Sequence, residues 1–268
     1  MMRTMLLFVV AVALIVPALG SADTTNKELQ SVKGLVSYQH GTLKKPLATN
    51  ASIVLADKDY ALTGPDSRGA VALPDSSVVT VGSQTKVQLA FFNQTDIANA
   101  KFVLYNGKTR FEVRHPQGSK ANYTFVTPTA SIGVRGTQGD IGVDKDSLEV
   151  NVYEVCDATM PVTVTTKSGK QFIVHADEAF VGKIVNGILQ AQVEQLTQQM
   201  IDQFSGDLGN LPLSLADYKS QAEGMASGAV SSATGGLLSG SEVASALGGL
   251  FKKKATPTPS PAHSATCS

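Results

Sequence analysis

A long series of short β-strand patterns constrains this fold more than any other feature of the sequence. Between about residues 34 and 183, apolar and polar residues alternate in short runs, as in 147–152, where Leu148, Val150 and Val152 would share one face. Turn-forming residues separate the runs, and no helical period interrupts them. Many short strands at such spacing predict an all-β domain, built as an antiparallel sandwich or a solenoid-like β stack.

Two dipeptides within this series predict tight turns. Asn106-Gly107 separates the strand patterns at 102–105 and 110–114, and Ser168-Gly169 separates two later ones. Asn and Gly readily take the positive φ angles of a primed two-residue turn. We therefore expect Asn106 and Gly107 to form the turn of a β-hairpin.

The pattern changes after residue 183. Apolar residues recur at helical spacing, and mostly Gln side chains surround them. Asn186 could cap the start of such a helix and Gly206 its end. The sequence therefore predicts an amphipathic helix over 186–206, packed on the β domain at 34–183 or on a second copy of the chain. Its apolar stripe comprises Leu189, Val193, Leu196, Met200 and Phe204.

The two ends of the chain differ in composition from the β region. Residues 1–22 combine Arg3, an apolar run and small residues suited to signal peptidase, which predicts a signal peptide and export to the periplasm or beyond. Residues 207–268 are rich in Gly, Ala and Ser and end in a Pro-rich stretch, so they predict a flexible tail. Once the signal is removed, we expect no stable membrane span.

Export would place the two cysteines in an oxidising compartment, where they could pair. Cys156 lies in the β region, whereas Cys267 is the penultimate residue of the predicted tail. Pairing would require this tail to dock on the domain. We therefore expect two independent thiols.

Composition and motifs exclude several function classes. The 22 Lys and Arg balance the 22 Asp and Glu, so the chain lacks the basic surface that drives nucleic-acid binding. The histidines have no metal-ligand spacing, and no nucleophile elbow occurs. Acidic residues such as Asp59, Asp75 and Asp140 are expected at turns, where their side chains would cap local backbone amides. We expect no catalytic residue, no metal and no cofactor.

The most specific string of the sequence runs from Thr127 to Thr137. It has the pattern of a strand entering a bend, where Gly133 and Gly136 would permit close backbone approach or positive φ. Arg135 would donate hydrogen bonds to carbonyls left unpaired at the bend. An anion-binding loop is the alternative, but no helix follows, so structural roles are favoured. The candidate site residues are Gly133, Val134, Arg135, Gly136 and Thr137.

With this string, the sequence resembles the FecR domain. This domain is the extracytoplasmic part of iron(III) dicitrate sensor-regulator proteins and also occurs in free-standing secreted bacterial proteins. The segments 104–113 and 62–78 add to the resemblance, which covers about residues 55–145 and continues weakly to about 183. It implies an all-β domain that binds or relays a signal outside the cytoplasm, with no catalytic residues.

Two features depart from the family pattern. A cleavable signal takes the place of the cytoplasmic anti-sigma segment and transmembrane helix of the regulators. Gly139-Asp140 stands where an apolar or aromatic residue usually follows the Gly-Thr pair. We therefore expect an exported, non-catalytic binding or signalling module whose partner is an envelope protein or a glycan. The alternative is a structural surface component that self-associates through its C-terminal helix.

Overall fold

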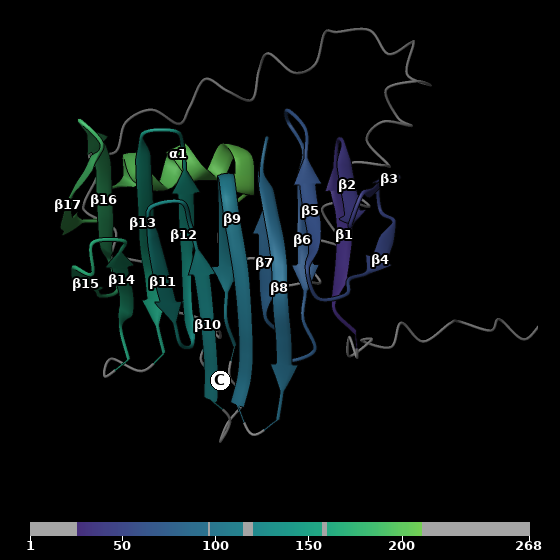
Figure 1. The fold of residues 1–268 in the computed structure, drawn as a ribbon, viewed down its shortest axis with the longest axis horizontal. Coiled ribbons are helices and arrows are strands. Elements are labelled where there is room, and N and C mark those ends of the chain that lie inside the picture. Colours follow the sequence, from purple (N-terminus) through teal and green to yellow (C-terminus); the bar gives the residue numbers. More distant parts are fainter. Residues whose placement is uncertain (1–25, 96, 115–119, 157–159, 211–268) are drawn as a thin grey trace, which may run out of the picture.

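The computed structural model describes residues 26–95, 97–114, 120–156 and 160–210. These residues form seventeen strands and one helix (Figure 1). The predicted signal peptide and nearly all of the predicted tail lie outside the described residues. Within the described part, no helix is long and apolar enough to cross a membrane.

The strands form two layers that share one long strand, β9 (Ile97–Glu112). The first layer contains, in order of pairing, β4 (Ser52–Val54), β1 (Glu28–Lys33), β6 (Arg68–Ala72), β7 (Val78–Val81), β9, β12 (Thr137–Val143), β13 (Ser147–Val155), β16 (Glu178–Val185) and β17 (Ile188–Gln195). The second contains β3 (Leu43–Leu47), β2 (Val36–His40), β5 (Asp59–Thr63), β8 (Lys86–Gln94), β9, β10 (Lys120–Val126), β11 (Ala130–Val134), β14 (Val162–Thr166) and β15 (Gln171–Val174).

The chain winds back and forth between the layers. Strands β10 and β11 extend the second layer, β12 and β13 the first, β14 and β15 the second, and β16 and β17 the first. All pairings of the described strands are antiparallel except that of β9 with β10. The predicted all-β fold is confirmed as an open sandwich whose strands are added progressively, as in a solenoid.

A single apolar core lies between the layers. Its centre contains three phenylalanines, of which Phe102 and Phe111 come from the two halves of β9 and Phe125 from β10. The ring centroid of Phe125 lies 5.3 Å from that of Phe102 and 5.3 Å from that of Phe111. Phe125 therefore connects the part of the core beside each half of the shared strand.

The predicted hairpin at Asn106-Gly107 is wrong, because β9 continues through both residues. Residues up to Asn106 pair with β8, and those from Gly107 onward pair with β12. Gly107 has a φ of 92°, and a Cβ there would lie 2.2 Å from Thr85 Oγ1. The left-handed backbone turns the strand from one layer into the other instead of reversing it.

Two other tight turns do form hairpins. Ser168-Gly169 joins β14 to β15, as predicted, and Gly169 has a φ of 83°. Asn186-Gly187 joins β16 to β17, with φ angles of 52° and 76° and with Val185 opposite Ile188. This second turn has the backbone of a primed hairpin loop.

The predicted helix over 186–206 is therefore wrong in its first half, where β17 runs from Ile188 to Gln195. The observed helix, α1 (Gln198–Leu208), has Thr197 as its N-cap and Gly209, at a φ of 87°, as its C-cap. The β structure extends from Glu28 to Gln195, beyond the expected 34–183. An i, i+4 spacing is even, so Leu189 and Val193 lie on one face of a strand as readily as on one face of a helix.

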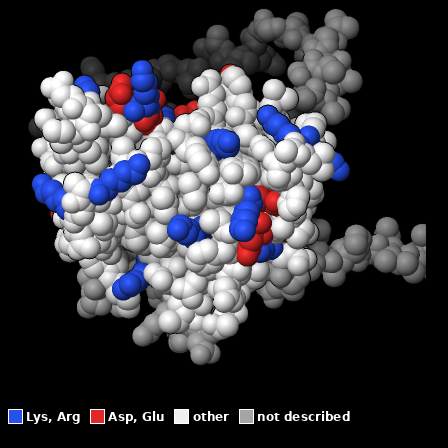
Figure 2. Space-filling model, viewed as in Figure 1, with Lys and Arg blue, Asp and Glu red and all other residues white. Residues whose placement is uncertain are grey.

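The molecular surface carries few charges on the face seen in Figure 1. Lys and Arg side chains are scattered singly over it, with few Asp and Glu among them (Figure 2). Charged residues make up only 16% of the whole chain. This face therefore presents no continuous basic surface of the kind that binds nucleic acid.

Candidate functional site

The Gly133–Thr137 string forms a crossing between the layers. Val134 ends β11, Gly136 has a φ of 63°, and Thr137 begins β12, so the predicted strand and bend are present. Arg135 is exposed, and its guanidinium makes no hydrogen bond within the described residues. A Cβ on Gly133 would meet only Thr163 O, at 3.9 Å, so this position has room for a side chain. None of the five residues lines a pocket described for the structure.

Helix α1 packs on the outer face of the first layer over Gly142 of β12 and over Gly82, which directly follows β7. Phe204 and Leu208 are its buried residues. A Cβ on Gly142 would lie 2.8 Å from Phe204 Cζ, and one on Gly82 would lie 2.9 Å from Leu208 Cδ2. The absence of side chains at these two positions allows the helix to lie close to the sheet.

The C-terminal end of α1 accepts hydrogen bonds from cations of the sheet. Arg68 Nε donates to Asp207 O at 3.0 Å, and Arg110 Nη1 donates to Gly209 O at 2.7 Å. A third cation, Lys108, forms an ion pair with the Asp207 carboxylate at 2.8 Å. The last turn of the helix has no basic residue of its own. The sheet therefore supplies the positive charge that a helix C-terminus favours.

A buried ion pair fixes one of these cations. Arg110 Nε and Nη2 donate to the two Asp140 carboxylate oxygens at 2.7 and 2.9 Å, and both side chains are almost fully buried. Tyr153 donates its hydroxyl to Asp140 as well, and burial followed by the Asp140 charge raises the Tyr153 pKa. The expectation of a turn is wrong for Asp140, which lies buried in β12, and for Asp59, which begins β5. Asp75 lies in a turn as expected and accepts a hydrogen bond from Ser77 N–H, although its side chain is buried.

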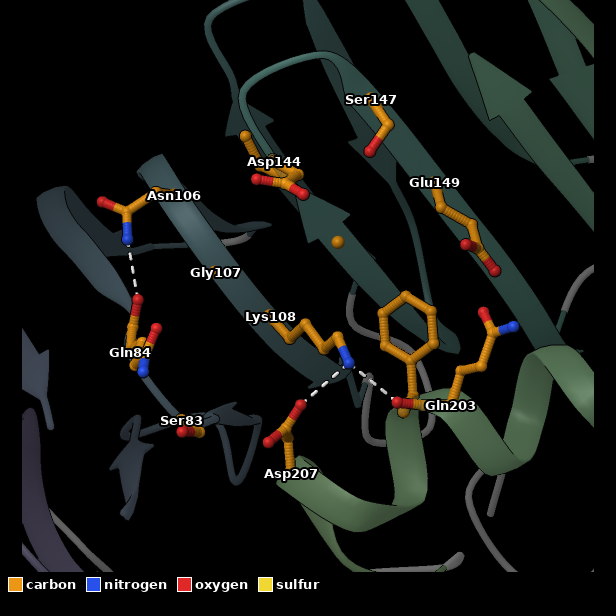
Figure 3. Close-up of a pocket in the computed structure, with 13 residues that line it drawn as sticks. Ser83, Gln84, Asn106, Gly107, Lys108, Asp144, Ser147, Glu149, Gln203 and Asp207 are labelled. Atoms are coloured by element: carbon orange, nitrogen blue, oxygen red, sulfur yellow. Dashed lines mark hydrogen bonds and ion pairs between the residues drawn. The ribbon is translucent and has the colours of Figure 1, made fainter. Parts of the chain in front are cut away.

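A pocket of about 490 Å³ opens between α1, the middle of β9 and the adjoining ends of β12 and β13 (Figure 3). Lys108 Nζ donates to Gln203 O at 2.7 Å and lies in the wall between the sheet and the helix. On another wall, Asn106 Nδ2 donates to Gln84 O at 2.7 Å. The lining residues are Ser83, Gln84, Asn106, Gly107, Lys108, Gly142, Val143, Asp144, Ser147, Glu149, Gln203, Phe204 and Asp207.

The electrostatics of this pocket favour a neutral or cationic ligand. Its single lysine, Lys108, is already paired with Asp207, which leaves the carboxyl groups of Asp144 and Glu149. Burial raises the pKa of Glu149, while Asn151 and Lys108 partly oppose the shift. Glu149 Oε1 is buried and has no hydrogen-bond partner among the described residues. The pocket thus offers a carboxyl oxygen and several amides to hydroxyl or amine donors, and it repels anions.

Sequence reasoning missed this pocket because its residues come from four separated parts of the chain. Only the two glycines beneath α1 gave a signal, since Gly82 follows one strand pattern and Gly142 interrupts another. No group of three or more His, Cys, Asp or Glu that could hold a metal occurs in the part of the chain that the structure describes.

These features define an all-β sandwich module with a helix-covered polar pocket. Comparison with protein families then identifies its central part: the model described as FecR protein matches residues 59–154, from β5 to β13. Residues 59–154 therefore resemble a FecR domain, as the sequence strings suggested. The pocket combines strands of this domain with a helix that lies beyond the matched segment.

Solved structures and curated sequences give more distant comparisons. Two crystal structures of a proposed anti-sigma factor from Parabacteroides distasonis are similar, with 17% and 18% sequence identity and TM-scores of 0.44 and 0.43. Each similarity covers 54% of this chain and 63% of the other, so less than two thirds of that protein is represented. No curated protein sequence matches the chain.

Proposed function

We propose that this chain is an exported, non-catalytic module of the bacterial cell envelope that binds a ligand and relays its presence. The FecR domain at residues 59–154 supports a role in signalling. The observation that carries the proposal is the pocket, because it is enclosed jointly by the FecR strands β9, β12 and β13 and by α1.

The state of Cys156 supports export. Cys156 is disulfide-bonded, so the expectation of two independent thiols is wrong. Structural disulfides persist in the periplasm and outside the cell, whereas cytosolic thiols are kept reduced. The oxidised cysteine is therefore consistent with the signal peptide expected from residues 1–22.

The lining of the pocket supports a neutral, hydroxyl-rich ligand such as an envelope glycan. Gln84, Asn106 and Gln203 line the pocket with amide groups, and Glu149 lines it with a carboxyl group. Sugar hydroxyls both donate and accept hydrogen bonds, so they match this mixed lining better than a phosphate or carboxylate would.

Ligand binding could be relayed to a partner because both the sheet and helix α1 line the pocket. A ligand that contacts Gln203 or Asp207 on α1 as well as Ser147 or Glu149 on β13 binds only while the helix is docked. Such a ligand shifts the population toward the docked helix by its differential affinity for that state. A partner protein could then recognise the docked or undocked surface.

The test is to fill the pocket mouth at an exposed position. Ser147 is exposed at the start of β13, so Ser147→Trp should block the pocket without disturbing the core. The matched control is Ser168→Trp, at the exposed turn between β14 and β15. Mature protein immobilised and exposed to native envelope extract should retain glycan with the wild type and Ser168→Trp, but not with Ser147→Trp. Equal retention by all three would contradict binding at this pocket.

Self-association through one helical stripe loses its basis in this structure. Leu189 and Val193 lie on β17 and pack toward the core, whereas Phe204 is buried between α1 and the sheet. The five stripe residues therefore do not form one face of one helix.

A further inference from the structure

The two layers have four edge strands, and three of them are protected against pairing with another chain. Strands β4 and β15 are only 3 and 4 residues long. Strand β3 carries Lys44, Lys45 and Pro46, residue types that discourage strand addition. Strand β17 is 8 residues long and contains no proline, lysine or arginine. It is the edge that lacks these protections among the described strands.

The backbone of β17 presents a free row of hydrogen-bonding groups. Leu196 N–H donates to Asp177 O at 2.9 Å, which fixes the phase of the antiparallel ladder with β16. Hydrogen-bonded and non-hydrogen-bonded positions alternate along such a ladder. The N–H and C=O groups of Leu189, Ala191 and Val193 therefore point away from β16, and no other described strand pairs with them.

The side chains around this edge include exposed apolar groups. Ile188 is 68% exposed and Val185 is 36% exposed. Leu189, Ala191 and Val193 are only partly buried, although they pack against the core. A neighbouring strand would remove more of this apolar surface from water.

We propose that β17 pairs antiparallel with β17 of a second copy of this chain, which joins the first layers of two molecules into one continuous sheet. A twofold axis through Ala191 places Leu189 opposite Val193 on the core side. Glu194 is the only charged residue of β17, and this register places it opposite Ile188 of the second copy, so no like charges meet. The same strand therefore complements itself in both hydrophobicity and charge. This proposal does not depend on a ligand in the pocket.

The test is to place a like charge opposite Glu194. Mature full-length wild-type protein should sediment as a dimer at micromolar concentration. Ile188→Glu would create two symmetric carboxylate pairs and should raise the dimer dissociation constant about tenfold. Ile188→Lys, which faces the same Glu194 with the opposite charge, should remain dimeric. Because Ile188 is 68% exposed, both variants should fold, and circular dichroism would verify this.

The matched control is Ile173→Glu on the short edge strand β15, where Ile173 is 45% exposed. This variant should dimerise like the wild type. A wild type that stays monomeric at its solubility limit overturns the proposal and leaves the edge to a strand from another protein. A folded Ile188→Glu variant that dimerises as tightly as the wild type overturns it as well.

Discussion

At the residue scale, one dipeptide has two different roles in this chain. Asn-Gly occurs at 106–107, inside a continuous strand, and at 186–187, in a tight hairpin turn. Both glycines have positive φ, 92° and 76°. The dipeptide thus predicts a positive φ for its glycine in both places, but only Asn186, and not Asn106, shares it. The surrounding pairing decides whether the chain reverses or changes layer.

Alanine substitutions at Gly107 and Gly187 should lower the unfolding free energy by different amounts. Gly187→Ala meets no atom within 4 Å, so it should cost only the left-handed backbone penalty of about 1–2 kcal/mol. Gly107→Ala adds a Cβ 2.2 Å from Thr85 Oγ1 and 2.6 Å from Thr85 Cα, so it should cost several kcal/mol. Urea unfolding measures both free energies. Equal losses would show that Gly107 is not crowded at the layer crossing.

Glu149 should give the pocket a pH-dependent effect on stability. Its pKa is raised in the folded state by burial, so the folded protein binds this proton more tightly than the unfolded chain does. The contribution of Glu149 to the unfolding free energy is fully present when the pH is below 4.5, the ordinary pKa of this group. It is lost as the pH rises through the higher pKa of the folded state.

The non-ionisable variant Glu149→Gln should therefore gain unfolding free energy relative to the wild type as pH rises from 4.5 to 7. The exposed turn residue Asp146 provides the matched carboxyl-to-amide control, Asp146→Asn. Chemical denaturation at several pH values gives both differences. A Glu149→Gln difference that stays constant with pH contradicts a raised pKa.

At the element scale, most strands could be predicted from the sequence, but the last strand, β17, was expected to be part of a helix. The alternation that predicts β13 and the Ser168-Gly169 hairpin appears directly in the structure. Leu189 and Val193 fit both a helix and a strand, because a separation of four residues satisfies either period. The decisive signal was the Asn186-Gly187 pair before them, which starts a hairpin.

Helix α1 should depend on Phe204 for its position on the sheet. Removing this buried ring should destabilise the docked helix by about 3–5 kcal/mol. A helix of 11 residues is not stable in water without such packing, so α1 should unfold locally. Phe204→Ala should therefore lose amide-exchange protection in α1 while β12 and β13 keep theirs. The exposed variant Gln198→Ala serves as the control and should keep the helix protected. Unchanged protection in Phe204→Ala would mean that the hydrogen bonds from the sheet cations suffice.

At the scale of the whole molecule, the two layers and their core followed from the sequence, but the polar outer face did not. Strand alternation places Asp140 and Arg110 on the face opposite the core, where solvent is the natural expectation. Their burial with Arg110 bound to Gly209 O depends on a helix that follows many residues later. A local pattern carries no information on such a distant covering, so the pocket could not be predicted from it.

The disulfide should tie the C-terminal segment of the chain covalently to the layer crossing of the domain. Cys156 follows β13, and its N–H donates to Gly136 O at 2.9 Å, at the layer crossing. The chain has one other cysteine, Cys267, so an intramolecular bond closes a loop of about 110 residues. Cys267→Ser should lower the unfolding free energy by about 2–5 kcal/mol. Non-reducing peptide mapping would identify the linked pair; rapid alkylation of both native thiols would contradict it.

The shared strand β9 has a mechanical consequence. Its first half is hydrogen-bonded to β8 and β10 in one layer, and its second half to β7 and β12 in the other. Two layers held only by side-chain packing could slide past each other under load. In this protein, such sliding would have to break backbone hydrogen bonds of β9, because this strand belongs to both layers. A pull on this domain along its strands should therefore be carried from one layer to the other through the main-chain hydrogen bonds of β9.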